Sequence, residues 1–410
     1  MSVPETKSSQ MLDVVLVTCI QRTKHNGDYL VSLQTIINNG EDDVYLLRSQ
    51  THNSSTINGI FSASFQQNHH SYRINFDDNN SSFVDVSFDS NDNSVGTISG
   101  YIPSLFVNDA STVLKQTPPG TDSLNFTFPV TVKNKWGSGK ECIPTSGWIS
   151  KLSRVTLFDP HWQVLSSRGS VDAGFNFDWK RGGSTMRALS KTKENITNTK
   201  FYAEKNWGVL GFPPVWFWVQ ANQFNSHDSL AVTIGGGERL KPRLLNFGRA
   251  NGYDTLALIG IHLDNKFYEF VPWGKGPNCV SWNVTSFGDW SFDGVSTINK
   301  ISKFRTTCRI TTASNDFGTA FRVPDTQGQN SGLKSFVRDS LRGRMILTLW
   351  KEQTLPAGDI ERTFILQDAE CTNAAVEIGG GDQSGIFKGE NACWSAKSRL
   401  AQPLKFLVGL

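Results

Sequence analysis

Short runs rich in Val, Ile, Phe, Tyr and Trp recur along the whole chain, and residues that favour turns separate them. The runs have the length of strands, and helical spacing of apolar residues over ten or more positions is hard to find. Dipeptides such as Asn26-Gly27 and Asp293-Gly294 are typical of hairpin turns. The pattern predicts an antiparallel all-β protein, either a barrel or a pair of sheets. The clearest strand candidates are Met11–Ile20, Asp28–Ile37, Ser71–Phe76, Phe83–Phe88, Asn125–Val132, Thr255–Leu263, Lys266–Pro272, Arg305–Ala313 and Arg344–Lys351.

A chain of 410 residues is too long for one compact core, so two domains are expected. We place them at residues 1–193 and 194–410. The polar segment Arg187–Lys200 is the best candidate for a linker between them. All 12 tryptophans lie from Trp136 onward, which predicts that ligand chemistry sits mainly in the second two-thirds. Short helices are expected only at Gly332–Arg338 and near Leu400.

Charge and cysteine usage exclude several classes of protein. A net charge of +3 is far from the basic excess of a nucleic-acid binder. The six cysteines are scattered and form no CxxC pair, so they are interpreted as reduced thiols of an intracellular protein, without a zinc or redox motif. No signal or transit sequence is evident. A cytoplasmic protein is therefore expected, and peripheral contact with a membrane or a lipid droplet stays open.

The segment Phe201–Gln223 carries three tryptophans, an acid and two amides. As a strand, residues 216–222 would place Trp216, Trp218, Gln220 and Asn222 on one face. The other face, from Phe217 to Ala221, has the composition of an ordinary core. Two indoles beside two amides suggest a pocket wall for a large and mostly apolar ligand. The alternative is that the tryptophans simply fill a large β core.

Acids and histidines recur next to aromatic residues: His161 precedes Trp162, Glu204 lies near Trp207, and His262 is followed by the run Lys266–Trp273. Burial of a carboxyl group in an apolar pocket raises its pKa, so that it can donate a proton near neutral pH. Neighbouring aromatic rings stabilise a cation by about 0.5–2 kcal/mol each. Such a lining suits the protonation of an alkene. Equally, His161 could be a core histidine, and Glu204 with Lys205 a solvated pair.

One short segment occurs twice in similar form. Residues 231–238, AVTIGGGE, recur as residues 375–382, AVEIGGGD. Two equivalent hairpin ends or chance convergence on turn chemistry would both explain it. Neither copy has the helix, Lys and Ser/Thr of a phosphate loop, so nucleotide binding is not expected.

Several of these segments closely resemble the tocopherol cyclase family. The resemblance runs in order over roughly residues 145–395, and its most specific parts are EKNWG at Glu204–Gly208 and WFWVQ at Trp216–Gln220. Other matching segments are Gly147-Trp148, Phe158–Gln163, Leu258–His262, Lys266–Trp273, Asp316–Arg322, Ala374–Gly381 and Lys388-Gly389. The resemblance implies two lipocalin-like β-barrel or sandwich domains with a ligand cavity. It also implies distant similarity to carotenoid hydratases.

The family's chemistry implies a cofactor-free enzyme of the isomerase or intramolecular lyase type. An acid protonates an isoprenoid alkene, and a phenol oxygen closes a chromanol-type ring on a prenylated phenol, quinol or related terpenoid. No metal or redox cofactor is implied. The candidate catalytic residues are Glu204, His161, His262 and Glu269. The candidate substrate-binding residues are Trp162, Asn206, Trp207, Trp216, Trp218, Gln220, Tyr268 and Trp273.

The first 60 residues depart from the family pattern, because they lack the aromatic run with a Phe-Glu-Gly-Trp-Tyr motif. This part has either diverged or been replaced, and the substrate can differ accordingly. Two rival functions remain: a non-catalytic carrier of terpenoid or lipid ligands, and an alkene hydratase or another terpenoid cyclase.

Overall fold

The computed structural model describes the strands and most of the turns between them. No helix occurs in this described part of the chain, which confirms the predicted all-β fold. The segment Gly332–Arg338 lies in a strand, so the helix expected there is wrong: it pairs with neighbours on both sides. Leu400 lies outside the described residues. These are 10–22, 29–38, 43–52, 71–75, 83–89, 94–102, 106–107, 115–116, 122–137, 161–181, 184–190, 196–208, 212, 215–240, 253–271, 278–285, 288–312, 321–325, 332–380 and 386–390.

The chain divides into two compact units, each assembled from more than one segment. Unit 1 comprises residues 1–20, 25–135 and 163–206, and unit 2 comprises residues 21–24, 136–162 and 207–410. The predicted boundary after residue 193 stays a prediction. The candidate linker Arg187–Lys200 contains the end of one strand and the start of another, so it is not simply a linker.

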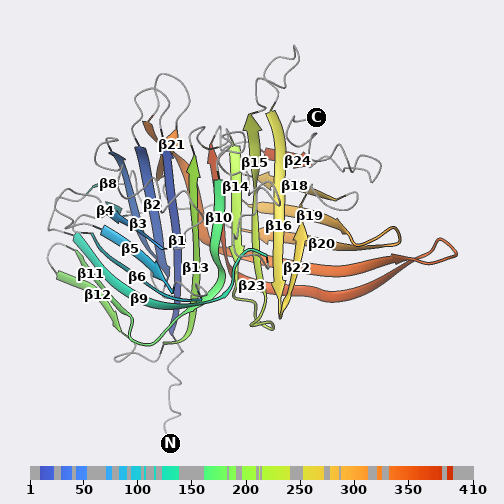
Figure 1. Cartoon of the computed structure of the whole chain (residues 1–410), viewed down its shortest axis with the longest axis horizontal. Coiled ribbons are helices and arrows are strands. Elements are labelled where there is room, and N and C mark those ends of the chain that lie inside the picture. Colours follow the sequence, from blue (N-terminus) through green and yellow to red (C-terminus); the bar gives the residue numbers. More distant parts are fainter. Residues whose placement is uncertain are drawn as a thin grey trace, which may run out of the picture. The chain divides into compact units, whose positions relative to one another are not determined.

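The first sheet has 11 strands and lies almost wholly in unit 1 (blue to green in Figure 1). Its order is β3-β2-β1-β13-β10-β9-β6-β5-β4, with β11 pairing to β9 and β12. Its inner face is rich in phenylalanine; Phe126 and Phe128 stack at 5.5 Å between ring centroids. The strands are β1 (Gln10–Arg22), β2 (Tyr29–Asn38), β3 (Asp43–His52), β4 (Tyr72–Asn75), β5 (Phe83–Phe88), β6 (Val95–Ile102), β9 (Asp122–Asn134), β10 (His161–Val171), β11 (Asn176–Arg181), β12 (Ser184–Ser190) and β13 (Ile196–Gly208). A separate pair joins β7 (Phe106–Val107) to β8 (Lys115–Gln116).

The second sheet also has 11 strands, in the order β17-β16-β15-β14-β23-β22-β20-β19-β18-β24, with β21 on β22. The aromatic strand β14 therefore lies near the middle, between β15 and β23. The strands are β14 (Val215–Ala221), β15 (Ala231–Leu240), β16 (Tyr253–Leu263), β17 (Lys266–Phe270), β18 (Cys279–Thr285), β19 (Asp289–Thr297), β20 (Ser302–Thr311), β21 (Phe321–Asp325), β22 (Gly332–Thr354), β23 (Ile360–Gly380) and β24 (Ile386–Glu390).

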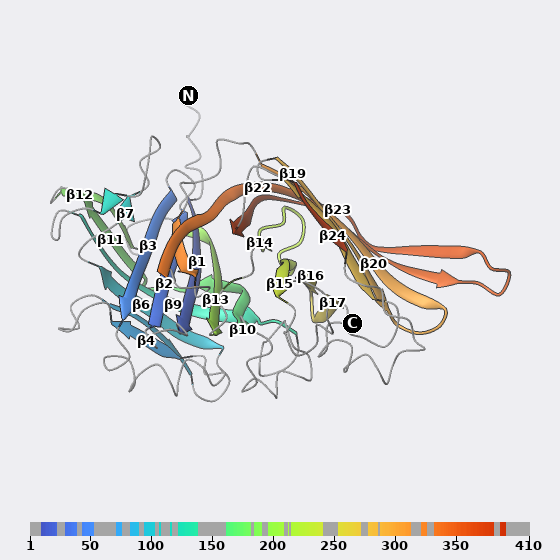
Figure 2. The ribbon, with the colours of Figure 1, turned by 90° about the horizontal axis from the view of Figure 1, so that it is seen from above.

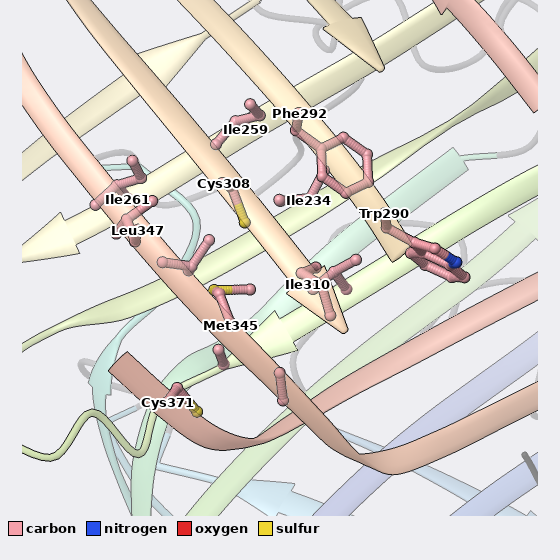
Figure 3. Packing of buried hydrophobic residues seen from close by; sticks show 14 of the residues in the cluster. Ile234, Ile259, Ile261, Trp290, Phe292, Cys308, Ile310, Met345, Leu347 and Cys371 are labelled. Carbon is pink, nitrogen blue, oxygen red and sulfur yellow. The ribbon is translucent and has the colours of Figure 1, made fainter. Parts of the chain in front are cut away.

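One face of the second sheet forms the main apolar core of unit 2 (Figure 3). Alternate residues of each strand contribute to it, because successive side chains of a strand point to opposite faces. Ile234 of β15, Ile259 of β16 and Leu347 of β22 are all fully buried there. Burying such a side chain stabilises the fold by about 1.5–3 kcal/mol.

The strands β22 and β23 have 23 and 21 residues and form a hairpin whose turn projects at one end of unit 2 (Figure 2). At this end the backbone N–H of Thr354 donates to the carbonyl of Ile301, which joins the hairpin to the residue just before β20. Among the described residues, no helix is long and apolar enough to cross a membrane.

Candidate functional site

The opposite face of the second sheet differs from the core in composition. On β14, Phe217 and Val219 belong to the apolar core, whereas Trp216, Trp218 and Gln220 are buried on the other side, as the alternation predicted. Residues opposite each other on antiparallel strands share a face. The strand register therefore collects one set of residues, called the aromatic face: Trp216, Trp218, Gln220, Thr233, Gly235, Leu258, Gly260, His262, Phe267, Glu269, Glu377 and Gly379.

One row of this face crosses four strands. Glu269 of β17 is opposite Gly260 of β16, which is opposite Thr233 of β15, and Thr233 is opposite Gln220 of β14. A carboxyl, a hydroxyl and an amide thus follow one another across the sheet. With about 4.8 Å between strands, the Cα atoms of Glu269 and Gln220 are about 14 Å apart.

Three indole rings of unit 2 lie directly on glycines of this face. A Cβ on Gly235 would lie 2.6 Å from the Trp162 ring, and a Cβ on Gly260 would lie 2.7 Å from the Trp136 ring. A Cβ on Gly379 would overlap the Trp216 ring. Only glycine leaves room for rings this close to the sheet, so these positions define where the indoles sit.

The close contact between aromatic rings and glycines explains the repeated AVxIGGG segments. The two copies lie in β15 and β23, which pair with β14 on its two sides. In the first copy β15 continues past the glycines to Leu240, so this copy is not a hairpin end. Gly235, Gly236 and Gly379 lie inside the sheet and make room for aromatic rings, whereas β23 ends at Gly380, so the second copy does lie at the end of a strand. The copies are equivalent as the two neighbours of one aromatic strand.

Glu269 lies in an aromatic setting. The Nε1–H of Trp136 donates to its Oε1 over 3.0 Å, and the Trp136 ring lies 5.7 Å from Trp162 and 5.6 Å from Phe267. Burial raises the pKa of the Glu269 carboxyl, and the hydrogen bond from Trp136 opposes this increase. Burial dominates, so the protonated form of Glu269 persists to higher pH than that of an exposed glutamate.

Gln220 and Thr233 have buried polar atoms with no hydrogen-bond partner among the described residues. These atoms are the Nε2 of Gln220 and the Oγ1 of Thr233, on residues that are 4% and 1% exposed. Leaving such a group unsatisfied costs about 1–3 kcal/mol. Two of them side by side on one face form a place where a ligand oxygen could accept and donate hydrogen bonds.

Trp216 is fixed on three sides. Its ring stacks on Phe212 at 4.8 Å, its edge faces Gly379, and its Nε1–H donates to Oε1 of Glu377 over 2.9 Å. Glu377 is in turn opposite Trp218 and Asp339 on the neighbouring strands. A second carboxyl group therefore lies on the aromatic face, held by an indole as Glu269 is.

The glutamate of the EKNWG motif, Glu204, has different hydrogen-bond donors from Glu269 and Glu377. Tyr202, Glu204 and Asn206 share one face of β13 in unit 1, and all three are buried. The Tyr202 hydroxyl donates to Oε2 of Glu204 over 2.5 Å, and Nδ2 of Asn206 donates to Oε1 over 3.0 Å. Both donors stabilise the charge of the carboxylate.

Lys205 lies on the opposite face of β13 and is fully buried, so the reading of Glu204 and Lys205 as a solvated pair is excluded. Its Nζ is 5.8 Å from the centre of the Tyr72 ring. Burial lowers the pKa of Lys205 to about 7.

The other predicted residues occupy varied positions. His262 is buried on the aromatic face, 4.5 Å from the Phe267 ring, and Trp207 is buried near the end of β13. Tyr268 belongs to the apolar core and contacts Phe304 edge-on at 5.0 Å. The side chain of His161 at the start of β10 and the whole of Trp273 lie outside the described residues.

Sequence reasoning missed Trp136, Thr233 and Glu377. Trp136 is 133 residues from its partner Glu269, and no local pattern joins them. Thr233 and Glu377 could have been found, because each alternates with core residues in the two AVxIGGG segments. The strand period would have placed both with the glycines, away from the core.

Known proteins resemble this chain over much of its length. A family model described as tocopherol cyclase-like matches residues 3–380. A probable chloroplastic tocopherol cyclase of Oryza sativa subsp. japonica is 31% identical over 246 residues, which is 60% of this chain and 44% of the rice protein. A chloroplastic tocopherol cyclase of Zea mays is 31% identical over 256 residues, 62% of this chain and 46% of the maize protein.

The chain spans less than half the length of these curated relatives. The family match begins at residue 3, so the N-terminal part has diverged in sequence and has not been replaced by an unrelated segment. Among solved structures, the crystal structure of CghA covers 88% of this chain and 87% of its own, with a TM-score of 0.36 and 9% identity.

Proposed function

Because the chain belongs to the tocopherol cyclase-like family, we propose that it is a cofactor-independent cyclase of prenylated phenols, quinols or related terpenoids. In this reaction a carboxylic acid gives its proton to the less substituted carbon of a trisubstituted alkene, and a tertiary cation forms. The phenol oxygen attacks the cation and closes the ring. The phenolic proton returns to the carboxylate, so the product is an isomer of the substrate and no redox cofactor is required.

Glu269 is the proposed proton donor. Burial raises the pKa of its carboxyl group, which is the condition for a glutamate to act as a general acid near neutral pH. The hydrogen bond from Trp136 fixes one of its oxygens, so the other oxygen is available to the alkene. A carboxyl group whose pKa is raised by burial and whose orientation is fixed by an indole is the single observation that carries the proposal.

The indoles of Trp136 and Trp162 are the proposed stabilisers of the cation. Their ring centroids lie 5.7 Å apart beside Glu269, and each ring lies directly against a glycine of the sheet. An indole face next to a desolvated cation contributes about 0.5–2 kcal/mol. Stabilisation that arises only when the cation forms accelerates the chemical step.

Gln220 and Thr233 are the proposed anchors of a polar group on the aromatic ring, such as a hydroxyl or carbonyl oxygen. Both have buried polar atoms that lack a partner in the described part of the chain. Gln220 and Thr233 lie at one end of the row that crosses the sheet, and Glu269 lies at the other end. The Cα atoms of Gln220 and Glu269 are about 14 Å apart. A phenol ring lying between them brings its prenyl alkene towards the acid.

Glu204 is the rival donor, because it belongs to the EKNWG motif that carries the family resemblance. Its carboxylate already accepts hydrogen bonds from Tyr202 and Asn206, which suits a fixed negative charge better than a proton donor. His262 is the further candidate for a base on the aromatic face. A cytoplasmic location remains a prediction.

The test is to incubate the purified protein with a prenylated hydroquinone in heavy water and to analyse the product by mass spectrometry and NMR. Deuterium at the former alkene carbon is expected. Cyclisation without deuterium at this carbon would overturn the protonation mechanism.

Site variants assign the donor. Glu269→Gln is expected to lower kcat by about 10²–10⁴-fold, the usual contribution of a general acid, with little change in substrate affinity. A full rate in Glu269→Gln together with a collapse in Glu204→Gln would move the donor to Glu204. Tight binding of several prenyl-phenols without turnover of any of them would favour the carrier function instead.

A further inference from the structure

The exposed apolar residues of the described chain gather at one place. Seven large hydrophobic side chains are exposed, and five of them lie at the end of unit 2 where the β19–β20 and β22–β23 turns meet. We call this region, residues 295–305 and 350–364, the hairpin tip. The five are Ile298, Ile301, Leu355, Ile360 and Phe364, which are 37–57% exposed.

The hairpin tip has a defined fold. The N–H of Thr354 donates to the carbonyl of Ile301, and the N–H of Leu355 donates to the carbonyl of Asp359, which closes the turn. β22 and β23 continue in regular pairing to Thr354 and Ile360. The apolar side chains are therefore presented by hydrogen-bonded strands and turns, and their exposure follows from this fold.

Cations accompany these side chains on the same surface. One face of β23 presents every second residue, namely Ile360, Arg362 and Phe364. The neighbouring strands add Lys303, Arg305 and Trp350 to the same face. The Trp350 ring lies 6.3 Å from Phe364. Apolar, aromatic and basic residues thus alternate within one small area.

Glu352 at the centre of this area is nearly fully buried under three cations. Its carboxylate contacts Lys303 at 3.2 Å, Arg305 at 3.4 Å and Arg362 at 3.2 Å, and it accepts a hydrogen bond from Nε1 of Trp350. One carboxylate neutralises only one of these charges. Over the whole hairpin tip five cations, including Lys300 and Lys351, outnumber three carboxylates, of which Asp359 and Glu361 are the other two.

We propose that the hairpin tip inserts into the surface of an anionic membrane. Its apolar side chains would enter the boundary between headgroups and acyl chains, and its cations would pair with lipid phosphates, as at other interfacial protein surfaces. Each basic residue near an anionic surface strengthens binding about fivefold. This function is separate from the proposed cyclisation and would give a protein that handles prenylated compounds access to a membrane.

A second copy of the chain is the competing occupant of this surface. In such a dimer the basic residues of the two hairpin tips would face each other, and five cations outnumber three carboxylates in each tip. This repulsion disfavours a second copy, whereas the same cations attract an anionic membrane.

The test is flotation of the full chain with vesicles, first of phosphatidylcholine alone and then of an equal mixture of phosphatidylcholine and phosphatidylglycerol. Binding to the mixed vesicles is expected, and it should fall with rising salt. Ile360→Asn with Phe364→Ser should weaken this binding by about tenfold or more. Lys300→Glu should weaken it by at least about fivefold.

The matched control is Val95→Asn with Tyr101→Ser, which removes the two other exposed apolar residues, in unit 1. This variant should bind like the unchanged protein. Absence of vesicle binding, equal loss in the control, or a dimer in sedimentation that only the hairpin-tip variants abolish would each overturn the proposal. All substituted side chains are exposed, and thermal unfolding curves verify that each variant is folded.

Discussion

The indole N–H of Trp136 donates a hydrogen bond to Oε1 of Glu269 over 3.0 Å, although 133 residues separate the two positions. The bond joins a segment before β10 to the edge strand β17 within unit 2. It also opposes the effect of burial on the same carboxyl group. The indole therefore sets both the orientation of Glu269 and the pH range in which it keeps its proton.

Trp136→Phe tests this control of the proton. The substitution keeps an aromatic ring but removes the hydrogen bond that lowers the pKa of Glu269, so the pKa should rise further. Because the protonated acid is the proposed active form, the decline of kcat/KM at high pH should move upward by the same amount. A pH–rate profile measures the shift.

Trp350→Phe is the matched control, because it removes an indole that also donates to a glutamate, Glu352, in the hairpin tip. Its pH–rate profile should equal that of the unchanged protein. If both variants shift the profile equally, or neither does, the hydrogen bond does not tune the acid.

Gly235→Ala should disturb the aromatic face by pushing against an indole. The new Cβ would lie 2.6 Å from the Trp162 ring, which must move. Overpacking of this kind costs about 1–3 kcal/mol of unfolding free energy, measurable by urea denaturation. In a Trp162→Leu background, where the ring is absent, the same alanine should cost less than half as much. Equal costs in the two backgrounds would show that the ring and the glycine are not in contact.

Thr233→Val should stabilise the ligand-free protein and weaken ligand binding. Valine has nearly the same shape and removes a buried hydroxyl without a partner in the described part of the chain, which should add about 1 kcal/mol to the unfolding free energy. Urea denaturation measures the gain, and the ligand-induced change in Tm measures the loss of binding.

Thr306→Val is the control for this pair of effects. Thr306 is buried to the same degree as Thr233, but its hydroxyl donates to the carbonyl of Thr348. Its replacement should destabilise the protein and leave ligand binding unchanged. Destabilisation of similar size in both variants would mean that Thr233 has a partner of its own.

Lys205 should make the stability of unit 1 rise with pH. Burial lowers its pKa from 10.5 to about 7 in the folded chain. Between these values the unfolded chain binds a proton that the folded chain does not, so the unfolding free energy increases with pH, by about 1.4 kcal/mol per unit. Below pH 7 both states bind the proton, and this contribution no longer changes.

Lys205→Met should abolish this slope, and urea denaturation between pH 7 and pH 9 measures it. Lys133→Met, at an exposed position of β9, should leave the slope intact. An unchanged slope in Lys205→Met would assign the pH dependence to other groups.

Local sequence patterns predicted the strands and the faces of β14, because strand periodicity is a property of neighbouring residues. This period alone separates the two faces of β14. One face carries Trp216, Trp218 and Gln220, and the other carries Phe217 and Val219. The helix expected at Gly332–Arg338 failed because pairing with β21 and β23 overrides local preference.

Register between distant strands could not be predicted. Nothing in the sequence indicates that Glu269, Thr233 and Gln220 lie in one row, or that Trp136 packs over Gly260. Spacing within one strand indicates which face a residue occupies, whereas its neighbours across the sheet depend on hydrogen-bond pairing over long loops. For this reason the acid Glu269 was found from its aromatic surroundings in the sequence, but its partner was not.

The strict alternation of β14 has a consequence for how this protein can change. Every second residue of the strand contributes to the core, and the residues between them form the aromatic face. Substitution at Trp216, Trp218 or Gln220 can therefore change the aromatic face while the core stays intact. Insertion or deletion of one residue would exchange the two sets of side chains and place amides in the core. Replacement of these residues is therefore compatible with the fold of this strand, whereas a change in its length is not.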